Sequence, residues 1–148
     1  MTISIIICAY NEEEKLSRCI DSIITQTHSD WELWVINDGS TDSTAKIVQQ
    51  YAVQDHRIHL HSQENQGLSS ARKSGIRCAQ GEYLTFIDAD DYVGELYLEH
   101  LLEPLHQHPK AQCIKGGHLR YDNGNITKVA APETSYFSPS EAITLSYH

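Results

Sequence analysis

The chain of 148 residues has the length of a single domain, and 40% of its residues are apolar, which excludes wholesale disorder. Its 11 basic residues face 20 acidic ones, for a net charge of −9. This balance excludes the basic surface that nucleic-acid binding requires, so we expect no nucleic-acid partner. A phosphorylated ligand would need a metal ion or helix N-termini to offset its charge.

The four cysteines, Cys8, Cys19, Cys78 and Cys113, form no Cys-x-x-Cys pair. Three of them lie in apolar strand or helix patterns, so we expect these three to be buried free thiols in a reducing compartment. No apolar run approaches the roughly 20 residues that span a bilayer, and no signal-peptide pattern is present. The sequence predicts a cytoplasmic chain without a transmembrane segment.

Apolar runs alternate with amphipathic segments from residue 3 to residue 87. The runs at 3–9, 31–36, 58–61 and 83–87 predict strands, with 83–87 expected in the centre of the sheet. Apolar residues spaced three or four apart predict helices at 12–26, around 47–51 and at 68–79, the last with Ala71, Ile76 and Ala79 facing inward. The βαβαβαβ order predicts an α/β fold with a mostly parallel sheet flanked by helices.

The pattern changes after residue 91. We expect a helix at 96–106 that Pro104 bends or ends, a strand at 111–114, and strands at 118–121 and 126–130 around the hairpin signal Asp122-Asn123-Gly124. Ser138-Pro139 opens a further helix, which has barely begun at His148. We therefore expect one domain over 1–148 that is truncated at its C-terminus.

The strand at 83–87 leads directly into Asp88-Ala89-Asp90-Asp91. Carboxylates two residues apart at the end of a strand can converge on Mg²⁺ or Mn²⁺, at the edge where open α/β sheets bind ligands. The alternative is an acidic turn that caps the next helix, and Asp91 fits this alternative best.

Polar loops at 8–11 and 37–40 reach the same edge and favour a nucleotide cleft. The absence of glycine-rich dinucleotide and P-loop motifs disfavours oxidoreductases and P-loop enzymes.

Four segments appear in a characteristic order: 5–12 (IIICAYNE), 35–42 (VINDGSTD), 65–72 (NQGLSSAR) and 81–91 (GEYLTFIDADD). Together they strongly resemble glycosyltransferase family 2, inverting enzymes of the GT-A fold that use nucleotide-diphosphate sugars. The resemblance implies a nucleotide-diphospho-sugar donor, favouring UDP, and Mn²⁺ or Mg²⁺ as cofactor. It further implies a saccharide or lipid-linked acceptor, and a role in cell-surface polysaccharide or glycoconjugate synthesis.

The resemblance also implies roles for single residues. Tyr10 would stack on the base, Asp38 would accept the imide N–H of uracil, and Arg72 would reach the base or the diphosphate. Asp88 would lie near the ribose or a metal-bound water, and Asp90 would bind the metal. The full donor-binding set is Cys8, Ala9, Tyr10, Glu12, Asp38, Gly67, Arg72, Asp88 and Ala89.

Each of these roles has a structural alternative. The alternative for Tyr10 is an ordinary residue at a strand end. The alternative for Asp38 is a turn residue that caps a helix, although Asp42 already meets that need. For Arg72 the alternative is a solvent-exposed charge on a helix. For the acidic residues 12–14, which include Glu12, the alternative is a set of solvent-exposed charges at the start of a helix.

In the implied mechanism, a metal on Asp90 stabilises the diphosphate leaving group while an acceptor hydroxyl attacks with inversion. The hydroxyl needs a general base, which the family carries well downstream of its Asp-x-Asp motif. Glu133 and Glu141 lack that context, so we expect the base beyond His148.

Two other functions stay open. They are a nucleotide-sugar binding module without turnover, and a sugar-1-phosphate nucleotidyltransferase, which would need a glycine-rich basic loop in place of Ala9-Tyr10-Asn11-Glu12. A peripheral location at the inner face of the membrane and a homodimer formed through an exposed sheet edge also stay open.

Overall fold

The computed structural model describes residues 1–107, 118–122 and 125–129. The chain divides into two compact units, Met1–Leu96 and Tyr97–His148. The first unit contains a parallel sheet with three helices, and the second contains one helix and a hairpin. Whether residues 1–148 act as one domain stays a prediction.

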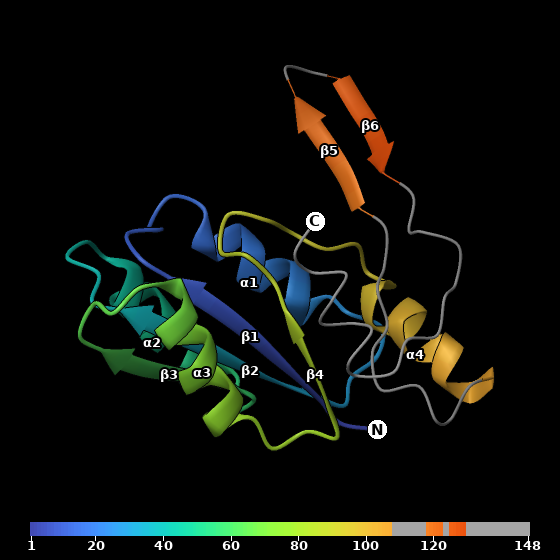
Figure 1. Cartoon of the computed structure of the whole chain (residues 1–148), viewed down its shortest axis with the longest axis horizontal. Helices are drawn as coiled ribbons and strands as arrows, with labels where there is room; N and C mark the ends of the chain where they lie inside the picture. The colour runs from blue at the N-terminus through green and yellow to red at the C-terminus, as the bar shows by residue number, and fades with distance from the viewer. Residues whose placement is uncertain (108–117, 123–124, 130–148) are drawn as a thin grey trace. The chain divides into compact units, whose positions relative to one another are not determined.

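The sheet of the first unit is formed by β1 (Ile3–Ala9), β2 (Trp31–Asp38), β3 (Ile58–Gln63) and β4 (Tyr83–Phe86). The strands lie in the order β3-β2-β1-β4, and every pairing is parallel (Figure 1). The predicted α/β fold with a parallel sheet is therefore confirmed. Strands β2 and β3 run two residues further than predicted, so their last rung pairs Asp38 with Gln63.

Within the described residues, strand β4 lies at one side of the sheet and not at its centre. Among the described residues it pairs only with β1, and Leu84 on it is 45% exposed. The central strand is β1, which lies between β2 and β4 and is buried at every position except Cys8. An apolar run of this length suits either position, so the run alone could not decide which of the described strands lies in the centre.

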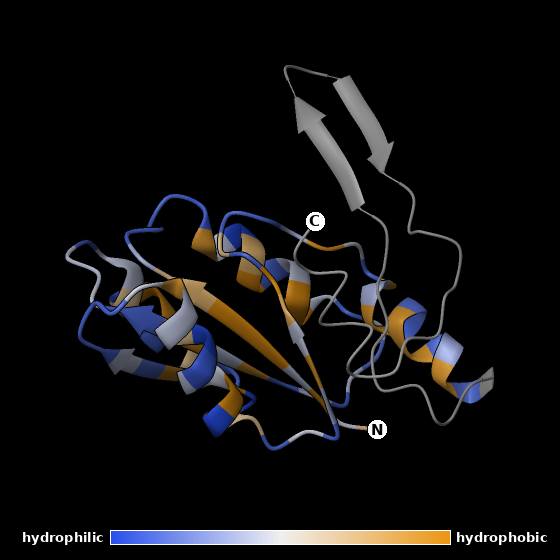
Figure 2. Ribbon diagram, viewed as in Figure 1, coloured by the Kyte–Doolittle hydropathy of each residue, from blue (hydrophilic) through white to orange (hydrophobic). Residues whose placement is uncertain are grey.

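Three helices accompany the sheet: α1 (Leu16–Ile24), α2 (Thr44–Gln54) and α3 (Leu68–Cys78). Figure 2 shows that each helix has a hydrophobic side and a hydrophilic side. The first helix begins four residues later than predicted, because the segment from Glu12 to Lys15 forms a turn. Its buried side consists of Leu16, Cys19, Ile20 and Ile23.

Helix α3 packs on the sheet through Ala71 and Gly75, which are both buried. A Cβ atom at Gly75 would overlap the side chain of Ile6, so this glycine permits the close approach of helix and strand. Ala79 packs against the core as predicted, but Ile76 is 49% exposed. The prediction that Ile76 faces inward was wrong, because the contact face runs through positions 71 and 75.

The second unit contains α4 (Tyr97–Gln107), with Pro104 inside the helix, and the antiparallel strands β5 (His118–Asp122) and β6 (Asn125–Val129). The predicted hairpin is confirmed, with Asp122 opposite Asn125. The strand predicted at 111–114 and the helix predicted from 139 lie outside the described residues. No helix among the described residues is long and apolar enough to cross a membrane.

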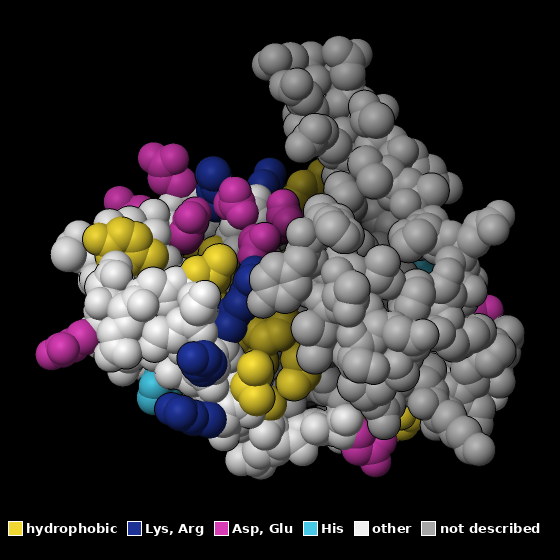
Figure 3. All heavy atoms as spheres, viewed as in Figure 1, with side chains coloured by type: hydrophobic (Ala, Val, Ile, Leu, Met, Phe, Trp, Pro, Cys, Tyr) yellow, Lys and Arg dark blue, Asp and Glu magenta, His cyan; other side chains and the backbone are white. Residues whose placement is uncertain are grey.

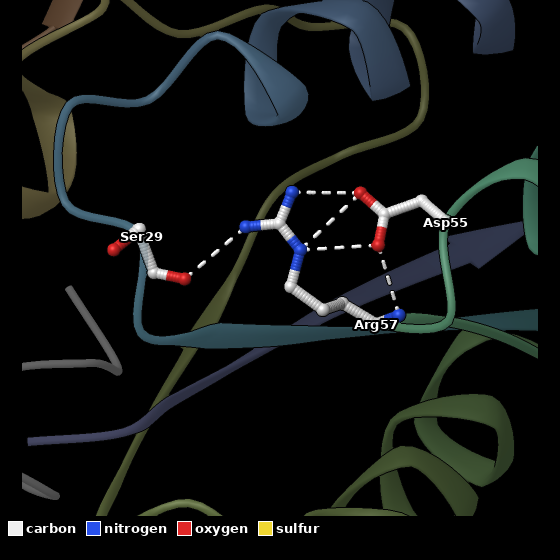
Figure 4. Close-up of polar contacts among 3 residues, drawn as sticks. All are labelled: Ser29, Asp55 and Arg57. Carbon is white, nitrogen blue, oxygen red and sulfur yellow. Dashed lines mark hydrogen bonds and ion pairs between the residues drawn. The ribbon is translucent and has the colours of Figure 1, made fainter.

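At the N-terminal end of the sheet, Arg57 ties the α2–β3 turn to the chain before β2 (Figure 4). Its Nη2 lies 2.7 Å from Oδ2 of Asp55, and its Nη1 donates to the Ser29 carbonyl at 3.1 Å. The guanidinium carbon also lies 3.7 Å from the centroid of the Trp31 ring. Hydrogen bonds from Arg57 lower the pKa of Asp55. This cluster is structural, since it lies at the edge opposite the predicted site.

Candidate functional site

The four parallel strands end at one common edge, and the segments that follow them carry the predicted site residues (Figure 1). These segments are 8–14, 37–44, 63–67 and 87–91. Hydrogen bonds join the first three of these segments, and an ion pair joins Asp88 of the last segment to Arg72 on α3, so the prediction that the loops meet at one edge is confirmed. Acidic and basic side chains lie close together in the upper part of Figure 3.

The segments after β1 and β2 are joined through Asn11. This residue has a φ of 55°, in the left-handed region that asparagine tolerates better than most residues. Its backbone N–H donates to Oγ of Ser40 at 3.0 Å, and its Oδ1 accepts from the N–H of Thr41 at 2.8 Å. The turn after Tyr10 is thereby fixed against the turn after Asp38.

A second set of bonds involves the acidic residues expected to be solvated. Oε2 of Glu13 accepts from the N–H of Ser43 at 2.9 Å, and Oδ2 of Asp42 accepts from the N–H of Glu13 at 3.1 Å. Oδ1 of Asp42 accepts from the N–H of Thr44 at the start of α2, which confirms Asp42 as a capping residue. Burial raises the pKa of Asp42, but these hydrogen bonds outweigh it and lower the pKa. Glu13 therefore helps to hold the segment after β1 against the start of α2.

Asp38 is only 4% exposed and anchors the segment before α3. Its Oδ1 accepts from Nε2 of Gln63 at 2.7 Å and from the N–H of Gln66 at 3.0 Å. Its Oδ2 accepts from the N–H of Gly67 at 2.8 Å. The structure thus gives Asp38 a structural role that the sequence did not predict, while its role in base recognition stays a prediction.

Arg72, Asp88 and the Cys8 thiol lie near one another between α3 and the ends of β1 and β4. Nη2 of Arg72 lies 3.5 Å from Oδ1 of Asp88, and its guanidinium carbon lies 5.5 Å from the ring centroid of Phe86. Burial raises the pKa of the Cys8 thiol to about 11, although Arg72 opposes the rise. Cys8 is therefore a neutral thiol near pH 7 and is unsuited to act as a nucleophile.

The segment after β4 is held against α1. Nζ of Lys15 lies 3.7 Å from Oδ2 of Asp90, and Arg18 donates to the Asp90 carbonyl at 3.1 Å. Arg18 also lies over the Tyr92 ring, at 4.6 Å from its centroid. The N–H of Asp91 closes a turn onto the carbonyl of Asp88, and α4 begins only at Tyr97. The capping role of Asp91 for the next helix stays a prediction.

No group of three or more His, Cys, Asp or Glu residues within 1–107, 118–122 and 125–129 is arranged to hold a metal. Asp88 and Asp90 nevertheless suit Mg²⁺ or Mn²⁺. Their side chains are 62% and 52% exposed, and such ions are commonly bound by one or two carboxylates together with substrate phosphates. The donor set fits a metal shared with a phosphorylated ligand.

The other residues of the predicted donor-binding set lie along the same edge of the sheet. Ala9 and Ala89 are buried, whereas Tyr10 is 50% exposed directly after β1. The backbone N–H of Glu12 donates to Oγ1 of Thr44 at 2.9 Å. Gly67 precedes α3 with a φ of 83°, a conformation that glycine adopts at little cost.

Three residues of this edge escaped the sequence analysis. Gln63 was excluded from the predicted β3, so its place opposite Asp38 was not visible. Lys15 lies immediately before α1 and Arg18 lies on it three residues later, a signal that could have been read, but their partner is distant in sequence.

A sequence model of the family described as "Glycosyl transferase family 2" matches residues 4–142. Glycosyltransferase GlyA of Streptococcus pneumoniae is 45% identical over 103 residues, which are 70% of this chain and 15% of that protein. The putative teichuronic acid biosynthesis glycosyltransferase TuaG of Bacillus subtilis is 35% identical over 135 residues, 89% of this chain and 54% of that protein. The chain thus spans between about a seventh and half of the length of these two relatives.

Solved structures agree with this relationship. S. aureus TarS 1–349 in complex with UDP-GlcNAc superimposes with a TM-score of 0.64 at 27% identity, over 74% of this chain and 32% of that chain. The mannosyltransferase PcManGT from Pyrobaculum calidifontis, in complex with GDP-Man and Mn²⁺, gives 0.65 at 25% identity, over 76% and 35%. These glycosyltransferase neighbours confirm the predicted GT-A fold. The chain therefore belongs to glycosyl transferase family 2.

Proposed function

We propose that this chain is the donor-binding part of a metal-assisted glycosyltransferase. It binds a nucleoside-diphosphate sugar, with UDP as the favoured nucleotide, and the whole protein transfers the sugar with inversion to an acceptor hydroxyl. The observation that carries the proposal is the buried carboxylate of Asp38 at the sheet edge, next to the segments that hold Arg72, Asp88 and Asp90. TarS with UDP-GlcNAc and PcManGT with GDP-Man support a donor of this class.

Each end of the donor has its own partners in this proposal. The half-exposed ring of Tyr10 stacks on the base, and Asp38 accepts the imide N–H of that base. Asp88 contacts the ribose, and Arg72 turns from Asp88 to the diphosphate, because phosphate is a strong bidentate partner for a guanidinium. The walls of the site are Cys8, Ala9, Glu12, Gly67 and Ala89.

Asp90, with Asp88 beside it, would hold Mn²⁺ or Mg²⁺. When bound, the ion supplies positive charge that stabilises the diphosphate leaving group. The chain itself contributes two cations to the same region, Lys15 beside Asp90 and Arg72 beside Asp88. Both side chains are more than 40% exposed, so they can reorient toward a diphosphate without unfolding the edge.

The acceptor belongs to the proposal for the whole protein. The name of TuaG refers to teichuronic acid biosynthesis, a process that builds a polysaccharide. We assign the present chain to polysaccharide or glycoconjugate synthesis, with a saccharide or lipid-linked acceptor.

The test is calorimetric titration of UDP into the purified chain, first with Mn²⁺ and then with EDTA. We expect binding that requires the metal and is lost in Asp90→Asn, whose fold is checked by circular dichroism. Lys46→Met, an exposed change on α2, serves as the control and should bind like the wild type. Metal-independent binding would remove Asp90 from its role. Failure of a folded chain to bind UDP, GDP or dTDP would overturn the proposal.

A further inference from the structure

The carboxylate of Asp38 is held from one side by a glutamine. Gln63 is its partner on the last rung between β2 and β3, and Nε2 of Gln63 donates to Oδ1 of Asp38 at 2.7 Å. Oε1 of the same amide accepts from Oγ of Ser74 on α3 at 2.6 Å. A strand, a buried carboxylate and a helix are thus connected through one side chain.

The orientation of this amide is fixed by chemistry. An ionised carboxylate only accepts hydrogen bonds, so the amide nitrogen, not the amide oxygen, must face Asp38. The Ser74 hydroxyl then donates to the oxygen at the other end. A reversed amide would place two acceptors 2.7 Å apart, which is unfavourable.

These bonds leave Asp38 with one free direction. A carboxylate has about four acceptor sites. Gln63 and the N–H of Gln66 occupy Oδ1, and the N–H of Gly67 occupies one site on Oδ2. The acceptor site that remains is on Oδ2, so an incoming donor meets a carboxylate whose rotation is already prevented.

We propose that Gln63 is a positioning residue that makes the site selective for bases with a ring N–H donor. It saturates Oδ1 of Asp38 and leaves Oδ2 for that donor. Uracil presents an N–H at its ring N3, whereas cytosine presents an acceptor there, which the fixed carboxylate repels. The inference rests on the proposed function, because it assumes that Asp38 faces the base.

The test compares the Kd values of UDP and CDP by calorimetry in the presence of Mn²⁺. In Gln63→Met the side chain keeps its length but loses the donor, so Asp38 can rotate. We expect the preference for UDP over CDP to fall about tenfold, the usual effect of one hydrogen bond to a charged group. Gln50→Met, the same change at an exposed site on α2, should keep the wild-type preference.

A milder pair of variants covers the case that Gln63→Met does not fold. Ser74→Ala removes the hydroxyl that fixes the Gln63 amide and should reduce the preference about threefold. Ser70→Ala, on the same helix, removes a hydroxyl that donates to Gln66 Oε1 and should leave the preference unchanged.

The possible outcomes separate the two proposals. If the variants weaken the binding of UDP and of CDP by the same factor, the preference between the two nucleotides equals that of the wild type. Gln63 is then merely structural, and the inference is overturned. If the folded wild-type chain binds neither nucleotide, the proposed function itself fails, and the inference fails with it.

Discussion

The ammonium group of Lys15 lies 3.7 Å from Oδ2 of Asp90, and Arg72 makes the equivalent contact with Asp88 at 3.5 Å. Both carboxylates of the Asp-x-Asp segment therefore face a cation, Lys15 immediately before α1 and Arg72 on α3. A divalent ion that binds Asp90 must compete with the positive charge of Lys15. Because both side chains of this pair are about half exposed, solvent weakens the competition without removing it.

Replacement of Lys15 by methionine should strengthen the binding of Mn²⁺ to the nucleotide-free chain. Two unit charges about 4 Å apart interact by about 1 kcal/mol in water, so we expect a gain of about two- to fivefold at low salt. Calorimetry or electron paramagnetic resonance can measure the Kd. The gain should shrink as ionic strength rises, because screening weakens the repulsion that is removed.

Lys46→Met is the matched control for this prediction, since it removes one exposed positive charge from α2. An equal gain in both variants would mean that net charge, rather than the Lys15–Asp90 contact, controls metal affinity. An unchanged Kd in Lys15→Met would mean that the ion does not bind near Asp90.

Two glycines of the edge should differ in their tolerance of alanine. Gly39 and Gly67 both have positive φ, at 76° and 83°, so either substitution strains the backbone by about 1–3 kcal/mol. A Cβ atom at Gly39 would also lie 2.7 Å from the backbone nitrogen of Asn65, whereas a Cβ atom at Gly67 meets nothing within 4 Å. Gly39→Ala should therefore lose more unfolding free energy than Gly67→Ala in urea denaturation. The reverse order would show that the two segments separate readily.

The sequence was sufficient for the strands and their order along the chain, because burial on both faces leaves long apolar runs such as that of β1. It was insufficient for properties that arise between elements. The exposure of Ile76 follows from the contact of Gly75 with β1, and the edge position of β4 follows from its pairing with β1 alone among the described residues.

The same limit applies to the site. Motif order identified Asp38, Arg72 and the acidic segment after β4, since these residues follow strand ends. The contact of Asp38 with Gln63 depends on the register of β2 and β3, which no local pattern encodes. The partners of Asp88 and Asp90 come from α3 and from the residue before α1, so these charges could not be paired in advance from the sequence.

The thiols of Cys8 and Cys19 should react slowly with alkylating reagents. Burial raises their pKa values to about 11 and about 12, so at pH 8 only about one Cys8 in a thousand is a thiolate. Mass spectrometry of peptides after timed treatment with iodoacetamide can measure each rate against a free cysteine peptide. Rates equal to that of the peptide would contradict the burial of Cys19 and the partial burial of Cys8.

Glu32 should make folding sensitive to acid. Burial raises its pKa, but hydrogen bonds from Ser4, from the backbone of Gln80 and from Trp34 outweigh burial and hold the pKa below the ordinary value of 4.5. A carboxyl whose pKa is lower in the folded than in the unfolded chain stabilises the fold fully above its unfolded pKa. This contribution is lost as the pH falls from about 4.5 through the lower folded value.

Glu32→Gln should therefore be less stable than the wild type at pH 7, with the difference shrinking below pH 4.5 as Glu32 of the wild type takes up its proton. Urea denaturation at several pH values from 7 to 3 measures the difference directly. Glu82→Gln, a change at an exposed residue near the start of β4, is the matched control and should follow the wild-type curve. A difference between Glu32→Gln and the wild type that stays constant over this range would mean that Glu32 stabilises the α3–β4 turn by shape and not by charge.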